Sequence, residues 1–186
     1  MNYQQLFESL YPGFFQATGI NEKPADKIFT ELVMDLRRDT PRKLPFVCPE
    51  GLTFDEYRGK NDPLQVAVRQ VDENWVQYFS EDTPVFCAFD RDRIAAFCIL
   101  SDWGWHQGMR IGGPGCVGTV PEYRKKGIGL EMVRQATNLL QKRAFDLSWI
   151  HYTHLEHWYR KLGYQPVLKW NCRGFLPDVN QQNSQK

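Results

Sequence analysis

The most informative stretch of the chain reads TVPEYRKKGIGL, residues 119–130. A run of strand formers ends there, three cations follow in a turn, and Gly127 and Gly129 stand at the start of an amphipathic pattern. Glycine has no Cβ, so its backbone N–H can approach a ligand closely. The first N–H groups of a helix have no partner within the helix and lie at the positive end of its dipole. The stretch therefore predicts a helix N-terminus suited to a phosphate or pyrophosphate.

Two common phosphate-binding motifs are absent from this stretch. The Walker motif requires a glycine, four residues and then Gly-Lys-Ser/Thr, and this run does not occur. The dinucleotide fingerprint requires a third glycine three residues after the second, where this chain has Met132. A glycine pair alone more often marks an ordinary turn, so the phosphate interpretation needs a second motif.

Upstream of this stretch the apolar residues are spaced mainly as in helices. The connection at residues 40–62 is long for a compact domain, and it is either functional or contains a hidden element. The predicted helices are one capped by Asn2 with Leu6, Phe7 and Leu10, one from Pro24 to Arg38 with Ile28, Leu32 and Leu36 on one face, and one opening at Asp62-Pro63 with Leu64, Val68, Val71, Trp75 and Phe79.

From residue 84 onward, short apolar runs rich in strand formers alternate with helical patterns. Residues 84–89 and 94–100 flank a polar quartet and predict an antiparallel hairpin. Residues 102–114, rich in Gly and Trp, are interpreted as a loop. Further predicted elements are strands at 115–120, 145–152 and 165–172 and helices at 127–143 and 153–162, the last stopped by Gly163. The predicted helices thus come first in the chain and are followed by strands that alternate with helices. This order indicates an α/β or α+β fold around one mixed sheet.

Composition limits the class of protein. The chain has 186 residues, 42% hydrophobic and 24% charged, with a formal net charge of +1. This composition excludes disorder and coiled coil, and the near-neutral charge disfavours nucleic acid as a partner. The longest apolar run, residues 94–100, is too short for a bilayer span, and the first residues do not resemble a signal peptide. Five cysteines without regular spacing are typical of reduced thiols, so a cytoplasmic protein without a membrane partner is expected.

A second motif, WYRKLGY at residues 158–164, follows one helix and one strand later. Together the two motifs resemble the signatures of the GNAT superfamily, the Gcn5-related N-acetyltransferases. RKKGIG at residues 124–129 matches the Arg/Gln-x-x-Gly-x-Gly/Ala loop of that family. WYRKLGY resembles its second signature, an aromatic-Tyr-x-Lys-x-Gly-aromatic helix end. The resemblance covers about residues 84–170, and both signatures stand at the separation typical of the family.

The resemblance implies a GNAT-type acyltransferase fold of the α/β (mixed α+β) class. Its central sheet would be mixed, mostly antiparallel and flanked by helices. A single domain is expected over residues 1–178, with a mainly helical acceptor side at 1–83 and a cofactor-binding core at 84–176. Residues 179–186 are expected to form a flexible polar tail.

The resemblance also implies acetyl-coenzyme A (acetyl-CoA) as co-substrate, and no metal. Backbone N–H groups of the glycine loop would hold the pyrophosphate, and the preceding strand would pair with the pantetheine arm and aim an N–H at the thioester oxygen. Gly115 or Gly118 is expected to mark a bulge that splays this strand from the next. The expected cofactor-binding residues are Val117, Gly118, Thr119, Arg124, Lys125, Lys126, Gly127, Ile128, Gly129 and Leu130.

Tyr159 matches the family's general acid. A phenol with a reference pKa of about 10 can donate a proton to a departing thiolate. The sequence departs from the family pattern nearby. Tyr152 stands where many members have a cofactor-contacting Asn, and Glu156 stands where a small residue is common. Thr153 is a polar side chain that could replace the missing contact.

The general base stays open. An amine acceptor arrives mostly protonated and must lose a proton before it attacks. The candidates, acting directly or through water, are Glu122, Asp102, His106 and His151. His151, His154 and His157 recur every three residues but fall on a predicted strand and a predicted helix, so no metal site is predicted. Cys116 is expected to be a small buried strand residue rather than a nucleophile.

The leading hypothesis is acetyl transfer from acetyl-CoA to a primary amine of a small molecule, by direct attack and without an acyl-enzyme. The acceptor classes considered are amino sugars, polyamines, amino acids and antibiotics. Trp103–His106 and Phe46–Tyr57 are candidate walls of the acceptor site. Two alternatives remain: a protein lysine or N-terminal acetyltransferase, and a non-catalytic acyl-CoA-binding sensor. Because many GNAT members pair through late strands, the resemblance also implies a homodimer.

Overall fold

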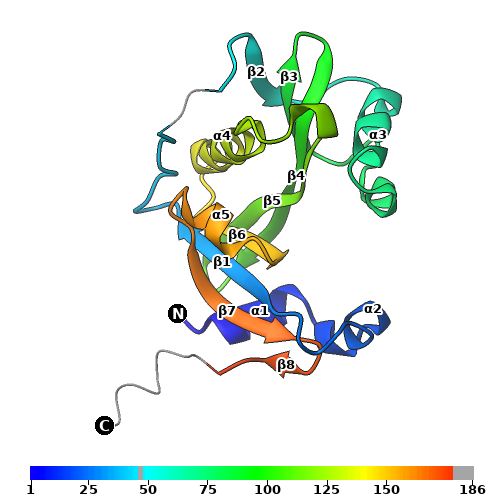
Figure 1. Cartoon of the computed structure of the whole chain (residues 1–186). Helices are drawn as coiled ribbons and strands as arrows, with labels where there is room; N and C mark the ends of the chain where they lie inside the picture. Colours follow the sequence, from blue (N-terminus) through cyan, green and yellow to red (C-terminus); the bar gives the residue numbers. More distant parts are fainter. Residues whose placement is uncertain (46–47, 178–186) are drawn as a thin grey trace.

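The computed structural model describes residues 1–45 and 48–177. Its strands are β1 (Phe29–Asp35), β2 (Leu52–Glu56), β3 (Val85–Asp90), β4 (Arg93–His106), β5 (Met109–Thr119), β6 (Leu147–Thr153), β7 (Gln165–Asn171) and β8 (Gly174–Phe175). They form one sheet in the order β2-β3-β4-β5-β6-β1-β7-β8 (Figure 1). Neighbouring strands are antiparallel except β5 and β6, which are parallel. The expected mixed, mostly antiparallel sheet is confirmed.

Helices cover both faces of this sheet. They are α1 (Tyr3–Leu10), α2 (Thr18–Asn21), α3 (Asn61–Arg69), α4 (Ile128–Lys142) and α5 (Glu156–Arg160), with 3-10 helices η1 (Phe14–Gln16), η2 (Glu73–Tyr78) and η3 (Pro121–Tyr123). α4 packs on one face, against β3, β4 and β5, and α1, α2 and α3 lie on the opposite side (Figure 1). The predicted cap of the first helix is confirmed, because Asn2 Oδ1 accepts the Gln5 N–H at 3.1 Å. No helix in the described part of the chain is long and apolar enough to cross a membrane.

The helix predicted from Pro24 to Arg38 is wrong, because these residues contribute β1, which pairs with β6 on one side and β7 on the other. Nearly every residue of β1 is buried, since both faces of the sheet are covered here. Leu32 and Leu36 are four residues apart, and that spacing places two side chains on one face of a strand as well as of a helix. Ile28, the third residue of the predicted apolar face, is 50% exposed.

Two more segments correct the sequence prediction. The long connection at residues 40–62 contains β2, which pairs with β3 at the edge of the sheet. Residues 102–114 are not a loop: β4 and β5 extend through them to a two-residue turn at Gln107-Gly108, whose φ angles are 51° and 73°. Of the candidate acceptor walls, Trp105 lies at this hairpin tip and is 70% exposed. Phe46 lies outside the described residues, as does the tail from residue 178 onward.

The third and fifth predicted helices are shorter than expected. α3 begins at Asn61, one residue before Asp62, and ends at Arg69. Of the later apolar positions, Val71 lies in a turn, Trp75 in η2 and Phe79 just after η2. The apolar spacing continues across this break because α3 and η2 both pack on the core. The helix predicted over residues 153–162 is present only as the five residues of α5.

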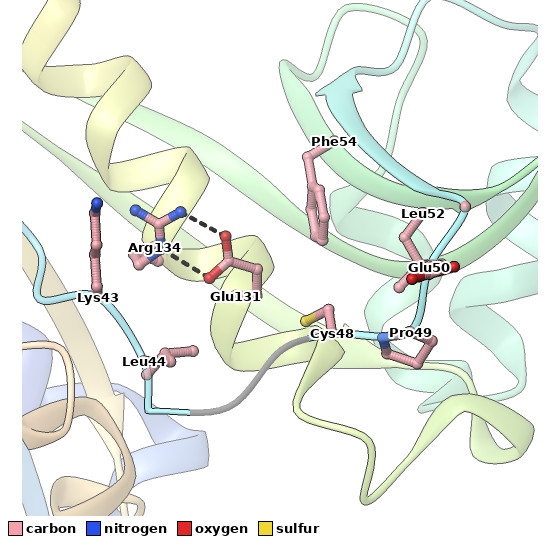
Figure 2. Close-up of a pocket in the computed structure, with 10 residues that line it drawn as sticks. Lys43, Leu44, Cys48, Pro49, Glu50, Leu52, Phe54, Glu131 and Arg134 are labelled. Carbon is pink, nitrogen blue, oxygen red and sulfur yellow. Dashed lines mark hydrogen bonds and ion pairs between the residues drawn. The ribbon is translucent and has the colours of Figure 1, made fainter.

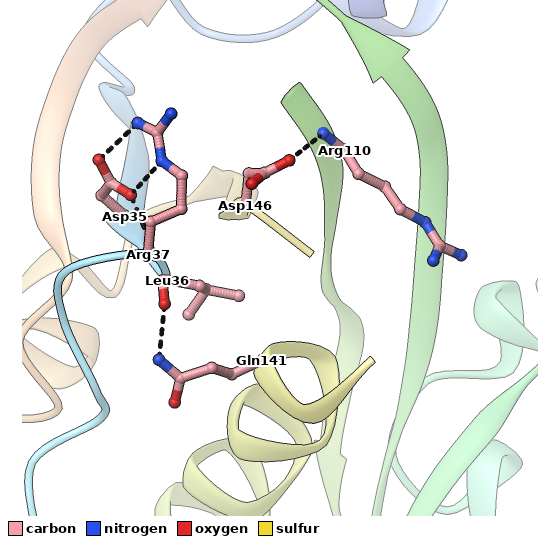
Figure 3. A network of polar contacts seen from close by, with 6 residues as sticks. All are labelled: Asp35, Leu36, Arg37, Arg110, Gln141 and Asp146. Atoms are coloured by element: carbon pink, nitrogen blue, oxygen red, sulfur yellow. Dashed lines mark hydrogen bonds and ion pairs between the residues drawn. The ribbon is translucent and has the colours of Figure 1, made fainter. Parts of the chain in front are cut away.

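Polar contacts hold together the end of the sheet where β5 and β6 pair (Figure 3). Asp146, just before β6, accepts the backbone N–H of Arg110 at 2.8 Å and returns its own N–H to the Arg110 carbonyl at 2.9 Å. On the α4 side, Gln141 Nε2 donates to the Leu36 carbonyl at 2.6 Å. These contacts fix the start of β6 against β5 and the end of β1 against α4.

Candidate active site

β5 and β6 separate soon after they begin. Their paired residues are Ile111 with Leu147 and Gly112 with Ser148. At the next position the two backbones are still close together. This closeness is evident at Gly113, where an added Cβ would lie 1.9 Å from the Trp149 carbonyl oxygen. Both strands then continue without further pairing to each other. The two parallel strands are therefore paired at one end only and run unpaired beyond it. We call this unpaired part of β5 and β6 the split.

β5 carries a bulge inside this split. Its pairing with β4 shifts between Gly115 and Gly118, where β5 has one residue more than its partner. Cys116 lies there with a φ of 45°, in the left-handed region. The bulge predicted at Gly115 or Gly118 is thus found between them. At Gly118 a larger residue is excluded sterically, because an added Cβ would lie 2.3 Å from the Phe97 ring. Bulges of this kind redirect a strand and occur often beside active sites.

The stretch of residues 119–130 turns from the end of β5 into the N-terminus of α4. Arg124 folds back on it, and its Nε donates to the Thr119 carbonyl at 3.0 Å. Lys125 and Gly127 form the turn with φ angles of 62° and 76°. No side chain caps the first turn of α4. Its first N–H groups therefore remain available at the positive end of a 15-residue helix, as the sequence predicted.

Gly129 brings three elements together. A Cβ there would lie 2.4 Å from Thr119 Oγ1 at the end of β5 and 3.7 Å from Trp158 Cζ2 of α5. The first turn of α4 can pack directly on β5 only because this residue has no side chain. The cations of residues 124–126 are exposed around the turn. The predicted cofactor-binding residues thus form one continuous path from the split strand through the loop to the helix N-terminus.

Tyr159 lies on α5, with only 5% of its surface exposed. Its ring packs against Trp158 and Tyr164, with centroids 4.8 and 6.1 Å away. Burial, together with Tyr164, Cys98 and Cys116 nearby, raises the pKa of Tyr159 above its usual value. The phenol therefore keeps its proton at neutral and moderately alkaline pH. Tyr159 belongs to the same apolar cluster as Cys116, the residue of the β5 bulge.

Three of the four candidate bases are held in ion pairs or turns away from the split. Glu122 pairs with Arg93, and both are exposed. Asp102 pairs with Arg110 at 2.7 Å in the β4–β5 hairpin. His106, at the tip of that hairpin, has its Nε2 2.9 Å from the Trp103 carbonyl oxygen. None of these three lies on β6 or in the split part of β5.

The fourth candidate, His151, lies on β6 in the split and contacts a carboxylate that the sequence analysis missed. Its Nδ1 is 3.0 Å from Oε2 of Glu31, a residue of β1 with no exposed surface. Glu31 was missed because the prediction placed it inside a helix. The signal that remained was an acidic residue, Glu31, in the interior of the otherwise mostly apolar run FTELVMD.

The described residues beside the split form neither a metal-binding group nor an activated thiol. His154 and His157 are exposed and lie after His151, in the turn and on α5. In residues 1–45 and 48–177, no group of three or more His, Cys, Asp or Glu side chains could hold a metal ion. Burial raises the pKa of the Cys116 thiol to about 11. Cys116 is therefore a neutral thiol at physiological pH and a poor nucleophile.

A cavity of about 420 Å³ lies beside α4 (Figure 2), and none of the predicted cofactor-binding residues lines it. It is lined by β2, by the chain before β2 and by α4. Arg134 and Glu131 face it from α4 and pair with each other at 2.6 Å. The candidate wall residue Phe54 lines this cavity and not the split.

The candidate site thus combines a split parallel strand pair, an uncapped helix N-terminus and the buried phenol of Tyr159. Residues 81–166 match the family model described as Acetyltransferase (GNAT) domain. Both motifs of the sequence analysis lie within this range. The chain therefore carries a GNAT domain at residues 81–166, as the two motifs predicted. No curated relative matches the sequence.

Solved structures share the fold. The glucosamine N-acetyltransferase region of a fungal multi-domain GH3 beta-N-acetylglucosaminidase superposes with a TM-score of 0.62 at 21% identity, over 78% of this chain and 20% of that one. A GCN5-related N-acetyltransferase from Sphaerobacter thermophilus gives 0.57 at 15% identity, over 80% and 51%. One from Kribbella flavida gives 0.53 at 15% identity, over 86% and 62%. The chain thus spans less than two thirds of each of these proteins, and the similarity concerns the fold.

Proposed function

We propose that the protein is an acetyl-CoA-dependent N-acetyltransferase that acts on a primary amine of a small molecule. The observation that carries this proposal is the split between β5 and β6 with the uncapped N-terminus of α4 at its mouth. An extended, amide-bearing arm fits the unpaired backbone edge of β5, and a pyrophosphate fits the free N–H groups of the helix. Acetyl-CoA combines these two groups with an activated acetyl thioester.

The residues present fit this co-substrate. Backbone N–H groups of Lys125 to Leu130 hold the pyrophosphate, and the cations of residues 124–126 attract it. Backbone groups of Val117 to Thr119 pair with the pantetheine arm, and one N–H beside the bulge stabilises negative charge on the thioester oxygen. Tyr159 donates its proton to the departing thiolate, which the raised pKa of its phenol allows.

The acceptor approaches from the face of the sheet that carries α1. α4 occupies the opposite face, where the phosphate-binding end of the site lies. Amino sugars are the first acceptors to test, because one structural neighbour is described as a glucosamine N-acetyltransferase region. Polyamines, amino acids and aminated antibiotics complete the panel.

The test is amine-dependent release of free thiol from acetyl-CoA, with mass spectrometry of the acetylated acceptor. Turnover with one small-molecule class and none with lysine or N-terminal peptides supports the proposal. Turnover with peptides alone would replace it with a protein acetyltransferase. Tight acetyl-CoA binding without turnover across both panels would indicate a sensor.

A further inference from the structure

The carboxylate of Glu31 lies fully buried within the sheet and accepts several hydrogen bonds. The donors are Trp149 Nε1 at 2.6 Å, Trp170 Nε1 at 2.7 Å, the Tyr152 backbone N–H at 3.0 Å and His151 Nδ1 at 3.0 Å. A buried charge is costly unless hydrogen bonds replace the lost water. Two indoles and a backbone amide can only donate, so this environment is built for the ionised carboxylate.

These donors fix the tautomer of His151. An ionised carboxylate only accepts, so the ring nitrogen that faces it must carry a proton. Nδ1 of His151 therefore donates to Glu31, and in the neutral imidazole the lone pair lies on Nε2. Nε2 has no hydrogen-bond partner among residues 1–45 and 48–177, and the His151 side chain is 21% exposed. The ring thus presents a basic nitrogen whose orientation is fixed by a buried acid.

The sheet is irregular on both sides of Glu31. The β1–β6 register shifts between Thr30 and Leu32, with the extra residue on β6, where Tyr152 has a φ of 57°. The β1–β7 register shifts between Glu31 and Leu32. The Tyr152 N–H is thereby directed to the Glu31 side chain. β5 and β6, the two strands of the split, therefore each contain a non-glycine residue with a left-handed φ angle. Backbone strain of this kind is characteristic of functional sites.

His151 and Tyr159 lie on opposite faces of the split. His151 shares a face of β6 with Trp149, which packs with Leu6 and Phe7 of α1. Tyr159 packs in the core cluster that contains the buried residues of α4. A base on one face and an acid on the other suit a reaction in which an amine enters from the α1 side and a thiol leaves on the α4 side.

Tyr11 adds a second polar group beside His151. The two rings stack with centroids 3.9 Å apart and planes 15° apart. In the described part of the chain, Tyr11 Oη is the one buried side-chain oxygen or nitrogen without a hydrogen-bond partner. Buried hydroxyls are normally paired. This hydroxyl therefore marks a place next to the imidazole that suits a polar group of a ligand.

We propose that His151 is the general base for the acceptor amine and that Glu31 is the positioning residue that orients it. This inference rests on the proposed function. Nε2 takes one proton from the ammonium form of the acceptor, directly or through one water. The freed nitrogen lone pair forms the C–N bond, the C–S bond breaks, and the thiolate takes the Tyr159 proton. The new N–H⁺ returns a proton to Tyr159, and His151 releases its proton to solvent, so that one proton is released per turnover.

The first test is the tautomer of His151 in the free wild-type protein, measured by NMR of the 15N-labelled imidazole rings. The titratable groups that face the ring are Glu31 from β1, Tyr11 at the end of α1 and Tyr152 on β6, with Lys23 Nζ 5.3 Å from the Tyr152 ring centroid. The expected result is a neutral ring with its proton on Nδ1. A proton on Nε2 in the neutral ring would overturn the proposal, whatever the turnover.

The second test is kinetic and compares His151→Gln with the exposed His154→Gln as matched control. We expect His151→Gln to lower kcat/KM by about 10²-fold or more at pH 7, with acetyl-CoA affinity and the circular dichroism spectrum unchanged. The fall of wild-type kcat/KM at acidic pH, where an imidazole is protonated, should be absent from the variant. His154→Gln should match the wild type.

The outcomes separate this inference from the proposed function. Full turnover by His151→Gln, or an unchanged acidic limb in its pH profile, would overturn the role of His151 and leave the acetyltransferase in place. No amine-dependent thiol release by the wild type across the whole panel would overturn the proposed function and this inference with it.

Discussion

Tyr159 is the single side chain on which the proposed chemistry depends most. Its Tyr159→Phe variant keeps the ring and its packing against Trp158 and Tyr164 but removes the proton. We expect kcat to fall by about 10²–10⁴-fold, the usual contribution of a general acid, while acetyl-CoA affinity changes little. Steady-state kinetics with a binding isotherm will measure both. A variant with wild-type turnover would exclude Tyr159 as the acid.

The pH dependence follows from the direction of the same pKa shift. A raised pKa means that the acid form of Tyr159 persists to higher pH than a free phenol, whose pKa is about 10. Wild-type turnover should therefore not decline between pH 7 and pH 9 through ionisation of this group.

Cys116 allows a test of direct transfer. The raised pKa of its thiol, about 11, leaves almost no thiolate at neutral pH. The Cys116→Ala variant should retain turnover within about threefold, a barrier change of less than about 1 kcal/mol, because a neutral thiol that takes no part in the transfer contributes little to the barrier. Intact mass spectrometry of the wild type under turnover should show no acetylated protein. A stable 42 Da adduct that disappears in Cys116→Ala would instead indicate an acyl-enzyme.

At the scale of elements, the divergence of β5 and β6 depends on the close approach at Gly113. A Cβ there would lie 1.9 Å from the Trp149 carbonyl oxygen, whereas one on Gly115 would meet only Ser101 Oγ at 3.4 Å. We expect Gly113→Ala to destabilise the protein by about 1–3 kcal/mol, as overpacking usually does. Gly115→Ala is the matched control, with a smaller effect. Urea unfolding of both variants measures the difference, and equal losses would argue against this role of Gly113.

The elements also show what the sequence can reveal. The loop into α4 was predictable because the glycines and cations that shape it are local in the sequence. β1 was not, since Leu32 within it and Leu36 just after it satisfy helix and strand spacing equally. Its neighbouring strands, moreover, come from the far end of the chain. The sequence placed the bulge to within two residues of Cys116. Its exact position depends on the pairing of β5 with β4, which decides which residue of β5 has no partner.

The same reasoning explains why the pairing of His151 with Glu31 was not predicted. His151 was visible as one of four possible bases, but nothing local distinguished it from Glu122, Asp102 or His106. Its distinction comes from Glu31, 120 residues away in the sequence and joined to it only through the β1–β6 pairing. A contact of this kind depends on topology, which the misassigned helix concealed.

At the scale of the whole molecule, the proposed reaction involves both faces of one sheet. In the proposed reaction the cationic turn and α4 bind phosphate on one face, and α1 with its aromatic neighbours surrounds His151 on the other. The split between β5 and β6 joins the two faces. This arrangement predicts that co-substrate and acceptor enter from opposite sides.

The central claim is that acetyl-CoA binds in this split, and thermal unfolding with and without acetyl-CoA tests it most directly. A ligand at a hundred times its Kd stabilises a protein by about 2.7 kcal/mol, so a clear rise in Tm is expected, with a much smaller rise for ADP, which lacks the pantetheine arm. Lys125→Gln with Lys126→Gln should reduce the rise, whereas Lys142→Gln, at the other end of α4, should not. No rise at millimolar acetyl-CoA, or an equal rise with ADP, would contradict the account.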